Sequence, residues 1–187
     1  MDVSEAIQTR RSIRRYKPDP VPREALNTIL GAVQWAPSWG NTQCWEVITV
    51  RDTNLRKQLD ETLPKKNSAR RSLVEAPVCL AVCGRDAVSG YYNGEASTRY
   101  GEWTLFDCAL AVQNLSLVAH SLGLGTVIIG QFDHEAAEKL LGIPEGHSLV
   151  CLVPLGYPAK ISKAPKRKSV SEFTFHEQFG QQGQNQN

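Results

Sequence analysis

The chain has 187 residues, with 21 Lys and Arg against 19 Asp and Glu, and 41% of its residues are hydrophobic. This balance is typical of a folded globular domain and excludes disorder of the whole chain. A net charge of +2 is too small to indicate a general nucleic-acid or membrane-surface binder, so an anion site depends on where the cations lie. No apolar run approaches the ~18 residues of a spanning helix, and the N-terminus lacks a signal-peptide pattern.

We therefore expect one domain over residues 1–177, located in the cytoplasm, and a disordered Gln/Gly/Asn-rich tail over 178–187. The cysteines are predicted to be buried thiols of a reducing compartment, and their spacing does not match a zinc site, so no metal site is predicted. They are Cys44, Cys79, Cys83, Cys108 and Cys151.

Hydrophobic periodicity predicts an alternation of helices and strands in the first half of the chain. The segment after Thr9 follows a helix end, and a helix with one buried stripe is predicted from Arg23 to Ala36. The spacing then predicts a strand over 46–50, a short helix over 54–63 and a buried strand over 77–83. Periodicity is lost over 85–100, which is typical of a loop or lid that controls substrate access.

The longest helix is predicted over 103–122, and its apolar residues cover almost every face. Such a helix has to be buried, either in the centre of the protein or at a subunit interface, which favours an obligate dimer. Its polar residues Asp107, Gln113 and Asn114 are expected to be hydrogen-bonded structural groups. A strand over 126–129, a helix capped by Asp133 and a strand over 148–155 follow.

Two basic clusters lie at opposite ends of the chain. The first, Arg10-Arg11-Ser12-Ile13-Arg14-Arg15, holds four guanidiniums and a hydroxyl, and the second is Lys166-Arg167-Lys168. Guanidiniums bind phosphate in a bidentate manner, so clusters that converge in the fold would make a phosphate site. A solvated basic face is the alternative interpretation.

The polar loop over 36–45 is a second candidate site. Asn41 and Gln43 each carry a donor and an acceptor, as does the edge of a planar heterocycle such as a flavin, and Trp39 and Trp45 could enclose such a ring. An ordinary helix-to-strand loop with a packed Trp is the alternative. The glycines over 123–130 do not make a dinucleotide fingerprint, because Ile128 stands where the third Gly is required and the segment follows a helix.

Taken in order, these motifs resemble the FMN-dependent nitroreductase family over about residues 3–177. The matching segments are Arg10 to Arg14, Ala36-Pro37-Ser38 with Gly40, Asn41, Gln43 and Trp45, Gly123 to Gly130, Pro154 to Pro158, and Lys166 to Lys168. The resemblance implies an α+β fold, an α/β/α sandwich with a central, mostly antiparallel sheet. It also implies an intertwined homodimer with the flavin at the interface.

Position by position, the resemblance implies that Arg10, Arg11 and Ser12 hold the phosphate and ribityl chain of FMN, and that Arg167 adds a C-terminal phosphate contact. Arg14 would lie near the pyrimidine side of the ring and stabilise negative charge on the reduced flavin. The contacts from the partner subunit would be Pro37, Ser38, Asn41 and Gln43. The backbone N–H near Ile129, followed by Gly130, would face flavin N5.

The sequence departs from the family at Cys44, where Pro is usual, and leaves open whether Lys166 or Lys168 accompanies Arg167. The implied activity is hydride transfer from NADH or NADPH through FMN to a nitroaromatic, a quinone or a similar electron-poor molecule, with ping-pong kinetics. The flavin carries this chemistry, so no catalytic side chain is predicted. A flavin-storing or flavin-sensing protein without turnover and a polyanion-binding module are the alternatives.

Overall fold

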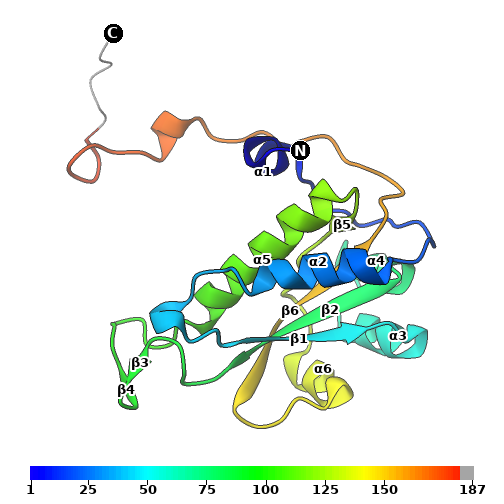
Figure 1. Ribbon diagram of the computed structural model, residues 1–187, viewed down its shortest axis with the longest axis horizontal. Coiled ribbons are helices and arrows are strands. Elements are labelled where there is room, and N and C mark those ends of the chain that lie inside the picture. Colours follow the sequence, from blue (N-terminus) through cyan, green and yellow to red (C-terminus); the bar gives the residue numbers. More distant parts are fainter. Residues whose placement is uncertain (182–187) are drawn as a thin grey trace.

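A central four-stranded sheet organises the protein, whose computed structural model describes residues 1–181 (Figure 1). The strands are β1 (Trp45–Val50), β2 (Val78–Arg85), β5 (Gly125–Thr126) and β6 (His147–Gly156), in the order β1-β2-β6-β5. Each of these strand pairs is antiparallel, and one isolated parallel bridge joins Ser12 to Thr126. The predicted α+β class with a mostly antiparallel sheet is confirmed.

Strand β2 shows why the sheet is covered on both faces. Its side chains alternate between two cores, as strand geometry requires. Val78, Leu80 and Val82 pack toward α2 (Arg23–Val33) and α5 (Thr104–Ser121).

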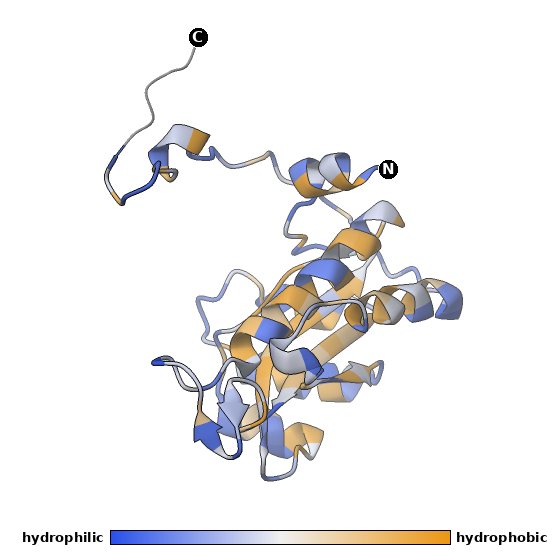
Figure 2. Ribbon diagram, turned by 60° about the vertical axis from the view of Figure 1, so that its left-hand side comes forward, coloured by the Kyte–Doolittle hydropathy of each residue, from blue (hydrophilic) through white to orange (hydrophobic). Residues whose placement is uncertain are grey.

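The alternate residues Cys79, Ala81 and Cys83 join the second core. This core lies under α3 (Thr53–Glu61), α4 (Arg70–Glu75) and α6 (His134–Leu141). The result is the predicted α/β/α sandwich, whose strands and inner helix faces are apolar in Figure 2.

All five cysteines are buried free thiols, as predicted. Burial raises the pKa of Cys79 and of Cys151 to about 12 and that of Cys83 to about 11. A hydrogen bond to Cys44 and burial also raise the pKa of the Cys108 thiol. These four thiols therefore stay protonated at neutral pH and act as small apolar side chains.

Several predicted elements differ in extent. Helix α2 ends at Val33, and the strand predicted over 126–129 is wrong in length, because β5 ends at Thr126 and Ile129 makes only an isolated bridge to Leu152.

Helix α4 was not predicted. Arg56, which is 5% exposed, donates to the carbonyls of Leu73, Val74 and Ala76 at the end of α4.

The predicted lid over 85–100 contains a small hairpin, β3 (Tyr91–Tyr92) and β4 (Glu95–Ala96). Asn93 and Gly94 both have positive φ at its turn, as a two-residue hairpin loop requires. Two further short elements are α1 (Val3–Thr9) and a 3-10 turn, η2 (Val170–Glu172). Residues 182–187 of the tail predicted over 178–187 lie outside the described residues.

The longest helix, α5, is buried on one side only. Leu105 and Phe106 in its first turn are 68% and 54% exposed, and Gln113 is also exposed, so Gln113 does not need the hydrogen-bond partner that was expected for it. Asn114 donates to the Ala32 carbonyl on α2, as expected of a structural residue. None of the helices in residues 1–181 is long and apolar enough to cross a membrane.

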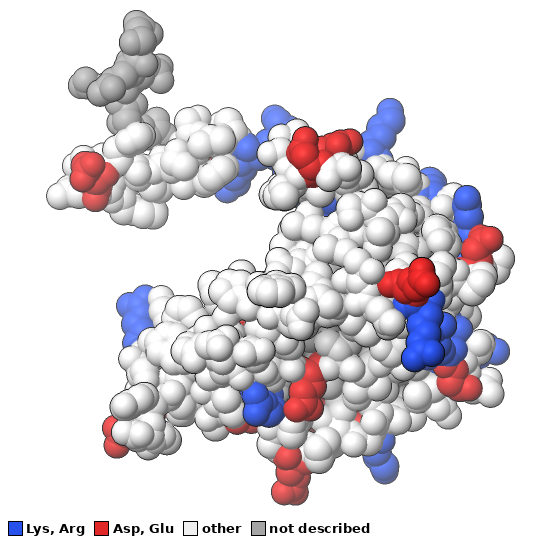
Figure 3. All heavy atoms as spheres, viewed as in Figure 1, with Lys and Arg blue, Asp and Glu red and all other residues white. Residues whose placement is uncertain are grey.

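The C-terminal segment over 159–181 leaves the body and runs past α1 (Figures 1 and 2). Three of its phenylalanines are exposed: Phe173, Phe175 and Phe179. Figure 3 shows a hollow between this segment and the rest of the molecule, with few charged side chains around it. The single chain thus exposes apolar surface on α5 and on its C-terminal segment, which face solvent unless another surface covers them.

Gly84 tests the packing of β2 against α5. A Cβ at this position would collide with the Thr104 side chain and lie 3.3 Å from Cys108 Sγ. We expect Gly84→Ala to lower the free energy of unfolding by about 1–3 kcal/mol, as overpacking does. Urea unfolding followed by circular dichroism measures it.

Gly31→Ala is the matched control, because a Cβ at Gly31 in α2 would meet no atom within 4 Å. It should raise stability by up to about 1 kcal/mol through helix propensity. Equal effects of the two substitutions would contradict the packing described for β2 and α5.

Candidate functional site

The two basic ends of the chain meet at one recess of about 290 Å³. Its lining combines residues from the segment after α1 with residues from the C-terminal segment. They are Arg10, Arg11, Ser12, Arg14, Ser162, Lys163, Pro165 and Arg167. The convergence that the sequence only suggested is therefore present within a single chain.

The second cation from the C-terminal segment in this recess is Lys163, and neither Lys166 nor Lys168 lines it. The predicted second cluster was Lys166-Arg167-Lys168, and neither Ser162 nor Lys163 was predicted to be a site residue. The run of cations from Lys160 to Lys168 without an acid was the signal that could have included Lys163. A run of lysines alone does not show which of them turn toward the recess.

The charges in the recess are not neutralised by the protein. Arg15, the fourth guanidinium of the first cluster, forms an ion pair with Glu75 at 2.9 Å. Among residues 1–181, no acid lies within 4 Å of the cationic atoms of Arg10, Arg14, Lys163 or Arg167. The recess is therefore a site of unbalanced positive charge, the condition for binding an anion.

Glu75 shows how the fourth guanidinium is kept out of the recess. Burial alone would raise the pKa of Glu75, but hydrogen bonds from Arg15 and from the Tyr16 N–H outweigh it and hold that pKa below its ordinary value. Glu75 is thus ionised at neutral pH and fixes Arg15 beside α4.

Arg11 differs from its neighbours, because its Nη1 donates to the carbonyls of Gln8 and Arg10, each at 2.8 Å. It therefore satisfies carbonyls that the end of α1 leaves open. Only the remaining nitrogens of its guanidinium are free for an anion. Arg11 therefore lines the recess and also has a structural role at the end of α1.

The backbone segment that carries these arginines is held in place by hydrogen bonds to the strands. Its Ile13 N–H donates to the Thr126 carbonyl at 2.9 Å, and the Tyr16 hydroxyl donates to the carbonyls of Ile13 and Pro154. Burial raises the pKa of Tyr16, so this donor keeps its proton over the physiological range. The arginines thus project from a backbone that is bonded to strands β5 and β6.

Helix α5 supports the same segment at its C-terminal end. His120 Nε2 lies 2.8 Å from Thr9 Oγ1, at the end of α1. Burial, followed by the charges of Arg10 and Arg11, lowers the pKa of His120. His120 is therefore neutral at pH 7 and serves as a hydrogen-bond partner of Thr9.

The loop that carries Pro37, Ser38, Asn41 and Gln43 lies at the other end of α5. The Trp39 N–H donates to Asp107 near the helix start, whereas His120 at the helix end contacts Thr9 beside the recess. At 1.5 Å per residue, Asp107 and His120 are about 20 Å apart along the helix. One chain therefore does not bring this loop to the basic recess.

The two tryptophans of this loop have different environments. Trp45 packs against the core beside α2 and α5, so the interpretation of Trp45 as an ordinary packed side chain is correct. Trp39 is half-buried and pairs with Trp103, with 5.2 Å between ring centroids. Trp39 is thus the aromatic residue at the loop surface.

The structure narrows the choice of backbone N–H near Ile129 that could face a ligand. The Ile129 N–H donates to the Leu152 carbonyl at 2.9 Å, and its side chain is 3% exposed, so this N–H belongs to the sheet and not to a ligand. Gly130 is exposed, and a Cβ there would meet nothing within 4 Å. Among the described residues, the Gly130 N–H has no recorded acceptor. Gly130 is therefore the N–H of this pair that is open to a ligand.

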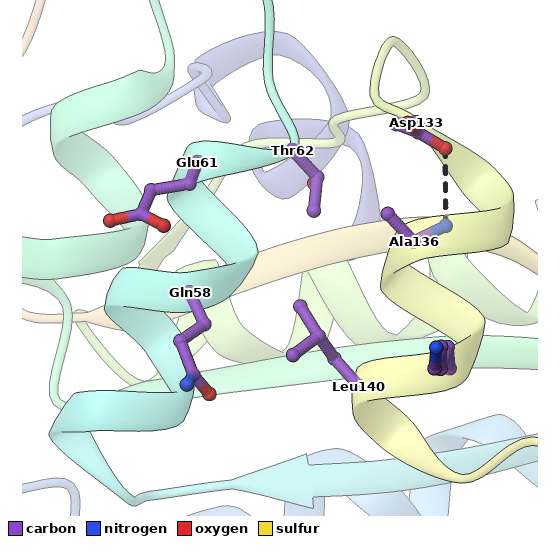
Figure 4. Close-up of a pocket in the computed structure, with 7 residues that line it drawn as sticks. Gln58, Glu61, Thr62, Asp133, Ala136 and Leu140 are labelled. Atoms are coloured by element: carbon purple, nitrogen blue, oxygen red, sulfur yellow. Dashed lines mark hydrogen bonds between the residues drawn. The ribbon is translucent and has the colours of Figure 1, made fainter.

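A second hollow lies elsewhere, between α3 and α6 (Figure 4). It measures about 760 Å³ and is lined in part by Glu61, Asp133 and a single cation, Lys139. The Asp133 carboxylate caps α6 by accepting from the Ala136 N–H at 3.1 Å. Within residues 1–181 no three His, Cys, Asp or Glu side chains gather as a metal site needs. The basic recess is the better candidate because it alone of the two concentrates one charge.

The family is decided by comparison with known proteins. A family model described as "Nitroreductase family" matches residues 7–69 and 60–157. The chain belongs to the nitroreductase family. The recess, the loop of residues 37–43 and the 129–130 segment therefore lie on a nitroreductase fold.

Individual relatives cover most of this nitroreductase chain. A protein of Methanothermobacter thermautotrophicus, provisionally named NADH dehydrogenase/NAD(P)H nitroreductase, is 37% identical over 164 residues, which cover 86% of this chain and 79% of the relative. The FMN reductase [NAD(P)H] of Bacillus subtilis is 31% identical over 191 residues, with 95% of this chain and 74% of the relative covered. The crystal structure of a nitroreductase family protein from Clostridium novyi NT matches with a TM-score of 0.76 and 26% identity over 100% of both chains.

Gly125 tests whether the basic segment is held by β5. A Cβ at Gly125 would collide with the Ile13 side chain, with its Cβ at 2.8 Å. We expect Gly125→Ala to push the segment of Arg10 to Arg14 away from the recess and to weaken binding of a phosphate-bearing ligand, for which FMN is the probe, at least tenfold, which corresponds to about 1.4 kcal/mol. Fluorescence titration measures the dissociation constant. Wild-type FMN affinity in a folded Gly125→Ala protein would contradict the described support.

Proposed function

We propose that this nitroreductase family member is an FMN-dependent oxidoreductase that takes hydride from NADH or NADPH and passes it to an electron-poor acceptor such as a nitroaromatic or a quinone. The observation that carries the proposal is the convergence of Arg10, Arg14, Lys163 and Arg167 on one recess without an acid to neutralise them. The names of the relatives from M. thermautotrophicus and B. subtilis support the flavin and the NAD(P)H.

The residues of the recess fit the phosphate end of FMN. Guanidinium forks and a lysine ammonium supply charge-assisted donors, and the hydroxyls of Ser12 and Ser162 supply neutral ones. A recess of about 290 Å³ takes one phosphate and part of the ribityl chain, which favours a mononucleotide over an extended polyanion. Arg167 would hold the phosphate from the C-terminal segment, and Arg10 from the N-terminal one.

FMN, when bound, supplies the hydride-accepting ring, and the protein supplies orientation and charge. Arg14 lines the same recess as the phosphate ligands and would favour the negative charge of the reduced ring. The exposed Gly130 N–H is the donor available to the ring edge in the 129–130 segment. No ionisable side chain has to transfer a proton in this proposal.

The site is completed by a second copy of the chain in this proposal. The loop with Pro37, Ser38, Asn41 and Gln43 lies about 20 Å from the recess along α5, so a partner chain has to supply it. The exposed Leu105 and Phe106 of α5 and the phenylalanines of the C-terminal segment provide the apolar surface for such a homodimer. An antiparallel pairing of two α5 helices would bring each loop to the opposite recess.

The acceptor reaction follows the hydride transfer in the same pocket, which gives ping-pong kinetics. Addition of NADH or NADPH without oxygen should remove the visible absorbance of the bound flavin, and an acceptor such as a quinone should restore it. Stopped-flow absorbance measures both half-reactions. A flavin that stays oxidised with either nucleotide would favour a storage or sensor protein instead.

Arg167→Glu tests the phosphate end of the site. Charge reversal places a carboxylate in the recess, so we expect the FMN dissociation constant to rise at least 100-fold, about 2.7 kcal/mol. The matched control is Lys168→Glu, which changes the net charge equally at a residue outside the recess. It should shift the constant less than threefold at 0.15 M salt, where exposed charges are screened. Equal losses in the two variants would contradict the placement of Arg167.

A further inference from the structure

We infer that Asp107 is a positioning residue that fixes the backbone of the loop over 38–43 in the shape in which it contacts the flavin. This inference rests on the proposed function. Asp107 is 1% exposed in the first turns of α5, and it lies far from the basic recess. It was expected to be a structural group, but its partners give it a more specific task.

The Asp107 carboxylate accepts hydrogen bonds from two separate parts of the chain. Its two oxygens accept from the Trp39 N–H, each at 3.1 Å, and Oδ2 accepts from the Ser89 hydroxyl at 2.6 Å. Cys44 Sγ, at the other end of the loop, lies 3.6 Å from the same oxygen. Asp107 thus holds both ends of the loop and ties them to the hairpin segment through Ser89.

The backbone of the loop needs such a support. Gly40, Asn41 and Gln43 have φ values of 49°, 56° and 46°. Two of these are not glycine, and left-handed conformations of such residues persist only where the surroundings enforce them. The cost is greatest at Gln43, since Asn adopts this conformation more readily than other residues with a side chain. Asn41 and Gln43 are the two residues whose amides were predicted to meet the flavin.

A second side chain, the partly buried Arg85, complements Asp107. Arg85 Nη2, from the end of β2, donates to the carbonyls of Thr42 at 3.0 Å and Gln43 at 3.2 Å. The Gln43 N–H donates to Ser38 Oγ at 2.9 Å. The Asp107 carboxylate therefore binds a backbone N–H of the loop, and the Arg85 guanidinium binds two of its carbonyls. These backbone groups thus have hydrogen-bond partners within the protein before any ligand binds.

This arrangement leaves ligand-binding groups free. The side chains of Asn41 and Gln43 are exposed and, within residues 1–181, bond only to each other, with Gln43 Nε2 donating to Asn41 Oδ1 at 3.3 Å. Ser38 Oγ accepts from the backbone and keeps its own proton to donate. Because the backbone shape is set before FMN arrives, binding needs less ordering of the loop.

The test compares three variants with wild type by FMN fluorescence titration. Asp107→Leu removes every acceptor and should raise the FMN dissociation constant at least tenfold. Asp107→Asn keeps one carbonyl oxygen for the Trp39 N–H and an amide that can donate to Ser89 Oγ, so it should recover affinity to within about threefold of wild type. The near-ultraviolet circular dichroism of the Trp39 and Trp103 pair should change in the Leu variant and return in the Asn variant.

Asn114→Ala is the control for stability alone. Asn114 is on the same helix and donates to Ala32 on α2, away from the loop. It should lower the melting temperature and leave the FMN dissociation constant unchanged. If Asn114→Ala weakens FMN binding as much as Asp107→Leu, Asp107 is only a stabilising residue and the inference is overturned.

Arg85→Met provides a second test in case Asp107→Leu does not fold. It removes both hydrogen bonds of Arg85 Nη2 to the loop carbonyls without burying a new charge, and should also raise the FMN dissociation constant at least tenfold. Wild-type affinity in Arg85→Met, or in a folded Asp107→Leu, overturns the inference while wild-type FMN binding keeps the proposed function intact. If the wild-type chain itself cannot bind FMN, the proposed function is lost first.

Discussion

Repulsion between like charges is the constraint that organises this site. Two unit charges about 4 Å apart repel by about 1 kcal/mol in water and by more where water is excluded. The fold nevertheless brings guanidiniums and an ammonium from both ends of the chain to one recess, and it removes only Arg15, which pairs with Glu75. The repulsion between these cations destabilises the contact between the two ends of the chain, and a phosphate dianion in the recess would reduce it. Binding of FMN would therefore stabilise the packing of the C-terminal segment against the segment after α1.

Helix α5 sets the distance between the two halves of the candidate site. Its C-terminal end supports the basic segment through the contact of His120 with Thr9, and its N-terminal end holds the loop through Asp107. A rigid helix does not let these halves meet within one chain. The same helix exposes Leu105 and Phe106, and this apolar surface, together with the separation of the two halves, supports the proposal that a second chain completes the site.

The sequence predicted β2 and α2 well because their hydrophobic patterns report burial directly, and the N-cap of α6 was visible in Asp133. The arrangement of the layers was implied by the family resemblance. It missed α4, whose end depends on the distant side chain of Arg56, and it missed the hairpin although Asn93-Gly94 is a turn signal. At the site, residue type identified the arginines and the loop. It could not show that the Ile129 N–H belongs to the sheet, that Lys163 and not Lys166 or Lys168 faces the recess, or that Asp107 holds the loop, because those facts depend on tertiary contacts.

The most direct test of the shared site is a complementation experiment with two defective chains, one carrying Arg10→Glu in the recess and the other Ser38→Glu in the loop. Each alone should bind no FMN. Co-expressed with different tags and purified as a mixed dimer, they should bind one FMN per two chains, because one recess and one loop remain intact and face each other. A mixed dimer that binds no FMN, or a wild-type protein that binds FMN as a monomer, would contradict a site built from two chains.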